Sequence, residues 1–125
     1  MKHCIYLHKL QAALYEPQGK MPRILTDRLW PRGVRKEALG DIVWYRNASP
    51  ESALRQGFHR GTLTRAQFEL AYRQQLAAQP ESWECLLHAL NTSSIQLLTA
   101  TKDPHTSYLV ILQDVLQTAY EGAHS

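Results

Sequence analysis

The sequence has few cysteines, no long apolar run and no glycine-rich phosphate loop, and each shortage excludes a class of protein. Cys4 and Cys85 are its only cysteines, too few for a disulfide framework, so we expect a reducing, cytoplasmic compartment. Polar side chains interrupt residues 1–14, and no apolar run approaches the ~20 residues of a membrane span, so we predict no signal peptide and no membrane protein. Without a Walker-type loop, hydrolysis of nucleoside triphosphates is not expected.

The length of the chain predicts one domain, spanning residues 1–125. Two cores in 125 residues would each be marginal, whereas a single domain of this size buries roughly two-thirds of its unfolded surface. Such a domain needs no disulfide or metal to stay folded. We therefore predict no cofactor and no metal.

Positive charge is concentrated in the first half of the chain. Residues 1–65 hold 12 Lys and Arg against 5 Asp and Glu, whereas residues 66–125 hold 2 against 6, so balances of +7 and −4 sum to the net charge of +3. Between Lys20 and Lys36 the only acid is Asp27. A field of this kind attracts nucleic acid, a nucleotide or a smaller phosphate or carboxylate. The alternative is a solvated basic loop that maintains solubility.

Strand and helix patterns alternate along the chain. Strands are predicted at 3–7, 23–28, 41–46 and 95–99. Helix starts are predicted at Ser49-Pro50, at a Thr64–Gln67 capping box, at Pro80 and at Asp103-Pro104, the last before an apolar stripe that begins with Tyr108. This order predicts an α/β fold, a small single domain with a short, partly parallel sheet flanked by helices. Ligands of such sheets bind outside the carboxyl ends of the strands, which directs attention to the loops after strands 23–28 and 95–99.

The loop after strand 23–28 carries an aspartate among arginines. Asp27, flanked by Arg28 and Arg32, is expected to stay ionised, so it suits a nucleophile, an orienting group or an acceptor for a ligand's hydroxyl or amino group. It is our candidate catalytic residue if the protein is an enzyme. The alternative is an ion pair that fixes the loop.

The same loop offers four candidate ligand-binding residues. Arg28 and Arg32 can present guanidinium forks to phosphate or carboxylate oxygens. Trp30 can stack on a base or ring, although a tryptophan is more commonly a core residue. Pro31 stiffens the loop, and Gly33 permits a turn that other residues resist.

Further candidates lie elsewhere in the chain. Arg55 and Lys102 complete the predicted anion site, Lys102 because it precedes a helix start, although Asp103 suits an ordinary helix cap there. His59 has cationic neighbours and is a weak candidate for a general acid or base. The pair Cys85 and His88 shares one helical face, but two ligands do not make a zinc site.

Residues Asp27-Arg28-Leu29-Trp30-Pro31-Arg32-Gly33 resemble the YeaO-like family, small bacterial proteins grouped as a domain of unknown function. The resemblance extends over residues 3–119 and implies a single α/β domain, without implying a particular activity. The chain departs from the family pattern at three positions: Asn47 stands where an acid is frequent, and Ser107 and Leu109 where Asn and Ala are frequent. If those positions belong to a shared site, this chain is an altered member.

Three hypotheses remain open from the sequence. The first is an enzyme acting on a nucleotide or other small anionic ligand, with Asp27 as the reacting or orienting group. The second is a non-catalytic module that binds a nucleic acid, a small anion or a protein through the same basic face. The third is a purely structural cluster. A stiff loop with one acid favours a compact anionic ligand over a long nucleic-acid track, and the sequence does not determine the oligomeric state.

Overall fold

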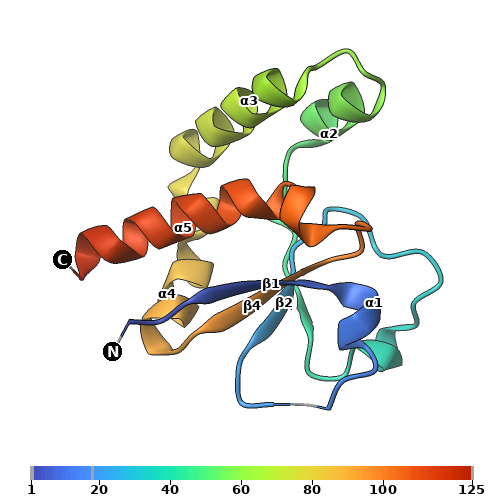
Figure 1. Ribbon diagram of the computed structural model, residues 1–125, viewed down its shortest axis with the longest axis vertical. Coiled ribbons are helices and arrows are strands. Elements are labelled where there is room, and N and C mark those ends of the chain that lie inside the picture. Colours follow the sequence, from blue (N-terminus) through green and yellow to red (C-terminus); the bar gives the residue numbers. More distant parts are fainter. Residues whose placement is uncertain (1, 18, 125) are drawn as a thin grey trace.

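A computed structural model describes residues 2–17 and 19–124, and its centre is a four-stranded parallel sheet (Figure 1). The strands are β1 (Ile5–Lys9), β2 (Arg23–Leu25), β3 (Val43–Trp44) and β4 (Ile95–Thr99), in the spatial order β1-β4-β2-β3. All three pairings are parallel, and Leu97 of β4 lies opposite Leu7 of β1 and Ile24 of β2. The carboxyl ends of all four strands therefore lie at one edge of the sheet.

Helices and short 3-10 turns connect the strands. The helices are α1 (Leu10–Ala13), α2 (Ser52–His59), α3 (Arg65–Ala78), α4 (Glu84–Thr92) and α5 (Leu109–Ala123). The 3-10 turns are Lys36–Leu39, Pro80–Ser82 and Pro104–Thr106. Within the described residues, no helix has both the length and the apolar character needed to cross a membrane.

Both faces of the sheet are covered. Neighbouring residues of a strand point to opposite faces, and apolar side chains on each face belong to a separate core. Leu97 and Ile24 belong to the larger core, which α3, α4 and α5 complete. Leu98 and Leu25 belong to a smaller core formed with α1 and the turn before β3. Leu25, Leu97 and Leu98 are fully buried, so the run of apolar residues in β4 reflects burial on both faces.

The predicted α/β domain is confirmed, while several boundaries differ. Strand β2 ends at Leu25 rather than at residue 28. Beyond Leu25, the backbone pairing with β4 continues only through Thr26, whose N–H donates to the Leu98 carbonyl at 3.3 Å. Asp103 caps a 3-10 turn through the His105 N–H, and α5 begins five residues later than Pro104, at Leu109. The predicted capping box at Thr64 and Gln67 is present.

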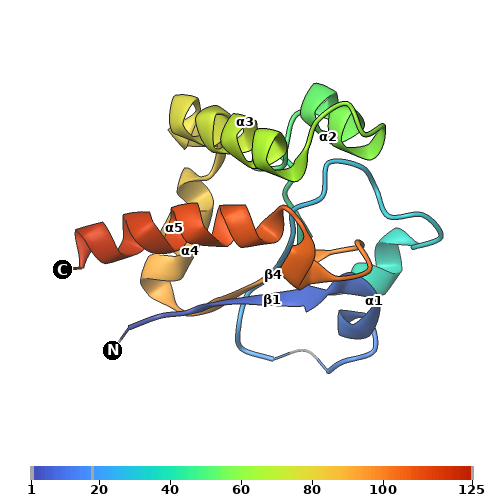
Figure 2. The same ribbon diagram turned by 45° about the horizontal axis from the view of Figure 1, so that its top comes forward.

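Helix α2 is the least buried of the longer helices and stands beyond the carboxyl end of the sheet (Figures 1 and 2). None of its residues is fully buried. It is joined to α3 by stacking of Phe58 on Phe68, with ring centroids 4.9 Å apart, while Leu63 of the connecting loop packs close to Gly57.

The central strand offers a direct test of this arrangement. Replacing Leu97 by alanine removes a fully buried side chain from the larger core and should lower the free energy of unfolding by about 2–5 kcal/mol. Leu70 is 61% exposed on α3, so Leu70→Ala should change it by less than about 0.5 kcal/mol. Urea unfolding followed by circular dichroism makes the comparison. Equal effects of the two substitutions would contradict the assigned core.

Candidate functional site

A pocket of about 420 Å³ lies at the carboxyl end of the sheet. It is bounded by the loops that follow β2 and β4, by α2, and by the starts of α3 and α5. Figure 2 shows α2 above the loop that follows β2. Its lining includes charged, aromatic, apolar and hydroxyl side chains: Asp27, Arg28, Leu29, Trp30, Arg32, Arg55, Phe58, His59, Arg65, Phe68, Ser107 and Tyr108. The pocket is therefore located where the parallel sheet predicts a ligand site.

The charge of the lining is predominantly positive. Four arginines and a histidine line the pocket, and Asp27 is the only acid among the lining residues. Arg23, which belongs to the same basic run of the sequence, is used elsewhere: its guanidinium forms an ion pair with Asp41 and donates to the Ala13 carbonyl at 2.9 Å. Of the basic residues between Lys20 and Lys36, only Arg28 and Arg32 line the pocket.

The Asp27 carboxylate is held by two donors, and neither is an arginine. One oxygen accepts a hydrogen bond from the Tyr108 hydroxyl at 2.7 Å, and the other accepts from the Ala100 N–H at 2.8 Å. The backbone carbonyl of Asp27 also accepts from the Trp44 indole N–H at 2.8 Å. One residue therefore links the loop after β2 to β3, to the loop after β4 and to the start of α5.

Tyr108 is kept neutral by its surroundings. Burial raises its pKa well above the usual value of 10, and the negative charge of Asp27 raises it further. Its hydroxyl lies 2.9 Å from the Thr26 hydroxyl, so Thr26 can donate to Tyr108 while Tyr108 donates to Asp27. The result is an ordered chain of three polar groups, of which Tyr108 and Asp27 line the pocket.

The pocket arginines differ in how many of their donors are already used. Arg28 donates to the carbonyls of Pro50 and Ser49 at 2.9 and 3.2 Å, which fixes the chain entering α2. Arg65 donates once, to the Thr106 carbonyl at 2.8 Å. Among the four pocket arginines, Arg55 is exceptional because its Nε is buried without a hydrogen-bond partner. Arg55 therefore gains most from an additional hydrogen-bond acceptor.

Trp30 is both a packing residue and a pocket wall. Its ring meets Trp44 edge to face at 5.1 Å, and its indole N–H donates to the Val34 carbonyl at 2.7 Å. It nevertheless remains 37% exposed and lines the pocket. The indole is therefore partly packed within the protein, and stacking of a ligand ring on its exposed part stays a prediction.

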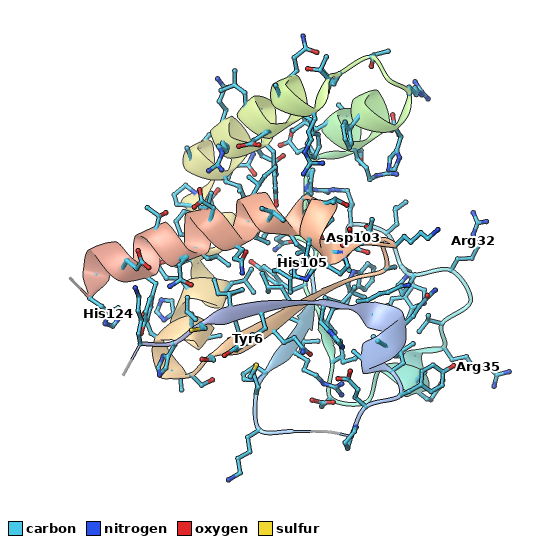
Figure 3. The ribbon with its side chains drawn as sticks, in the orientation of Figure 1. Tyr6, Arg32, Arg35, Asp103, His105 and His124 are labelled. Atoms are coloured by element: carbon cyan, nitrogen blue, oxygen red, sulfur yellow. The ribbon has the colours of Figure 1, made fainter. Side chains whose placement is uncertain are left out.

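Five of the seven predicted site residues line the pocket: Asp27, Arg28, Trp30, Arg32 and Arg55. Arg32 lies at its rim, since its side chain extends away from the body of the protein (Figure 3). Gly33 is outside the lining and makes the predicted turn, with φ of +77°. Lys102 is exposed and outside the lining, so the second predicted loop contributes Ala100 and Thr101 in its place.

Three important parts of the site were not predicted from the sequence. Arg65 follows the cap residue of α3 and is ordinary in sequence, while Tyr108 was assigned to the apolar stripe of the last helix. Phe58 comes from a helix with no fully buried residue. Only the meeting of α2, α3 and α5 over the sheet brings these side chains to Asp27. His59, the weak acid–base candidate, also lines the pocket.

The remaining candidates lie outside this pocket. Cys85 and His88 are both exposed, and the described part of the chain contains no group of three or more His, Cys, Asp or Glu side chains that could hold a metal. Of the three departures from the family pattern, Ser107 lines the pocket, where its hydroxyl donates to the Pro104 carbonyl at 2.7 Å. Asn47 is exposed and Leu109 is fully buried.

Comparison with known proteins shows the family of this chain. The model of a family described as the inactive DUF488-N3 subclade matches residues 5–124. Uncharacterized protein YeaO of Escherichia coli (strain K12) is 31% identical over 107 residues, which cover 84% of this chain and 93% of that protein. Uncharacterized protein Rv3073c of Mycobacterium tuberculosis (strain ATCC 25618 / H37Rv) is 28% identical over 94 residues, or 75% and 79% of the two chains. No solved structure is significantly similar to this chain.

The buried Tyr108 hydroxyl predicts a loss of stability in alkali. Because its pKa is raised in the folded state, Tyr108 contributes stability that is complete below the unfolded value of about 10 and is lost as pH rises above it. Tyr108→Phe should therefore reduce the alkaline decline in unfolding free energy by up to about 1.4 kcal/mol per pH unit. At neutral pH the same substitution should cost about 1–3 kcal/mol, because Asp27 loses a donor.

Urea unfolding at a series of values between about pH 8 and pH 11 measures both effects. Tyr15 is 91% exposed, so Tyr15→Phe is the matched control and should leave the alkaline decline unchanged. An identical pH dependence in the wild type and Tyr108→Phe would exclude the assigned environment of Tyr108.

Proposed function

This chain belongs to the inactive DUF488-N3 subclade and is a YeaO-like protein, and we propose that it binds a small anionic ligand with an aromatic body without transforming it. The observation that carries the proposal is the composition of the pocket. Its lining has four arginines and a histidine, and the carboxylate of its one acid is already hydrogen-bonded within the protein. Such a pocket attracts negative charge and has an aspartate that is fixed in place.

Anion binding is centred on Arg55 and Arg65. Arg55 lines the pocket with a guanidinium whose buried Nε has no hydrogen-bond partner, and Arg65 has donors beyond the one given to Thr106, so an anionic oxygen in the pocket can accept from both guanidinium groups. A charge-assisted hydrogen bond of this kind is worth about 1.5–3 kcal/mol. Arg28 adds to the positive field, although two of its N–H groups hold the start of α2.

The apolar walls favour a ligand with a flat ring. Leu29, Trp30 and Phe58 line the pocket and are each at least 36% exposed, so a ring placed against them buries apolar surface. A volume of about 420 Å³ is within the range of small-molecule sites. A nucleotide combines a ring of this kind with a phosphate.

The enzymatic alternative assigns Asp27 a reaction with the ligand or a role in orienting it. It is less well supported, because Asp27 already has a structural role, in which its two oxygens hold Tyr108 and the loop after β4 in place. The Ser107 hydroxyl is likewise engaged, with the Pro104 carbonyl. The description of the matching family as inactive supports binding without turnover.

Isothermal titration with 1-naphthyl phosphate and neutral 1-naphthol tests the proposal. The phosphate should bind at least about 10-fold more tightly, since only it can satisfy the arginines. Arg55→Gln should weaken phosphate binding by about 10- to 100-fold. Arg35→Gln is the matched control, because Arg35 is exposed on the same side of the protein, outside the pocket lining (Figure 3), and it should bind as the wild type does.

Two results would count against this function. Equal binding of naphthol and its phosphate would show that the pocket does not select an anion. Release of naphthol from the phosphate at a rate that falls in Arg55→Gln would establish catalysis and favour the enzymatic alternative.

A further inference from the structure

The pocket contains a feature that anion binding alone does not explain, namely a carboxylate among the arginines. Asp27 lines the pocket and is partly exposed. A ligand that carried only negative charge would be repelled by it. The ligand that complements the whole lining therefore has an anionic end for the arginines and a hydrogen-bond-donating end for Asp27.

Asp27 retains the capacity for two further hydrogen bonds. A carboxylate offers roughly four lone-pair sites, and Tyr108 and Ala100 each occupy one, on different oxygens. One acceptor position thus remains on each oxygen. A carboxylate in this state matches two neighbouring N–H donors, as in the bidentate pairing of carboxylates with guanidinium groups.

The orientation of the carboxylate is set before a ligand arrives. The Tyr108 hydroxyl is buried and neutral, and together with the Ala100 N–H it holds the two oxygens from two different segments, the start of α5 and the loop after β4. A fixed acceptor loses little conformational entropy on binding and discriminates strongly against ligands that lack the matching donors.

We propose that Asp27 is the specificity-determining residue of the pocket and that the ligand class is a guanine nucleotide. Guanine has a ring N–H beside an exocyclic amino group on one edge, which supplies the two adjacent donors. Adenine and cytosine place an amino group beside a ring acceptor, and uracil has one N–H between two carbonyls. The inference rests on the proposed function, since the phosphate is held by Arg55 and Arg65 and the base lies against Trp30 and Phe58.

Titration of the wild-type chain with three nucleoside monophosphates tests the inference. GMP has both donors, IMP lacks only the amino group, and AMP presents one donor beside an acceptor. GMP should bind about 10- to 100-fold more tightly than IMP or AMP. Ribose 5-phosphate, which has no base, should bind most weakly. This ranking needs no variant and so does not depend on the folding of any substitution.

Two substitutions test whether Asp27 causes the expected order of nucleotide affinities. Asp27→Asn replaces one acceptor by a donor and should abolish the preference for GMP over AMP, while Arg55→Gln should weaken all three nucleotides by a similar factor and keep their order. Equal binding of GMP, IMP and AMP would overturn the inference and leave the proposed function intact. Binding of 1-naphthyl phosphate without binding of any nucleotide would do the same, whereas binding of none of these probes would overturn both.

Discussion

The hydrogen bonds to the Asp27 carboxylate are the interaction on which the site depends. Through them, the loop after β2 is tied to the loop after β4 and to Tyr108 at the start of α5. A partly buried carboxylate oxygen without a donor is costly, so the three segments are held in one arrangement. These segments form the inner wall of the pocket, and the shape of that wall therefore depends on this one side chain.

The outer wall of the pocket has a different origin. Helix α2 buries none of its residues fully, and polar contacts at its start position it. Arg28 donates to the Ser49 and Pro50 carbonyls, while the amide of Gln75 on α3 donates to Ser49 and accepts from the Glu51 N–H, each at 2.9 Å. Hydrogen bonds thus hold the start of α2, stacking of Phe58 on Phe68 holds its other end, and Arg55 lies between these two contacts and lines the pocket.

Much of the fold follows from local sequence patterns. The capping box at Thr64, the apolar run of β4 and the turn at Gly33 were all predicted, because each depends on a few neighbouring residues. Boundaries were predicted less well, since they depend on distant partners or on short turns that precede a helix. Strand β2 is short because only Thr26 continues its pairing with β4, and α5 starts late because Asp103 caps a separate 3-10 turn.

The sequence by itself determined that one loop concentrates an aspartate, arginines and a tryptophan, and that such a loop follows a strand of an α/β sheet. Only the tertiary structure decided which of these side chains have free donors or acceptors. Arg23 and Arg28 are occupied by contacts within the protein, while Arg55 keeps a buried N–H without a partner and Tyr108 becomes a donor to Asp27. Hydrogen bonds between segments far apart in the chain set these roles, and no local pattern encodes them.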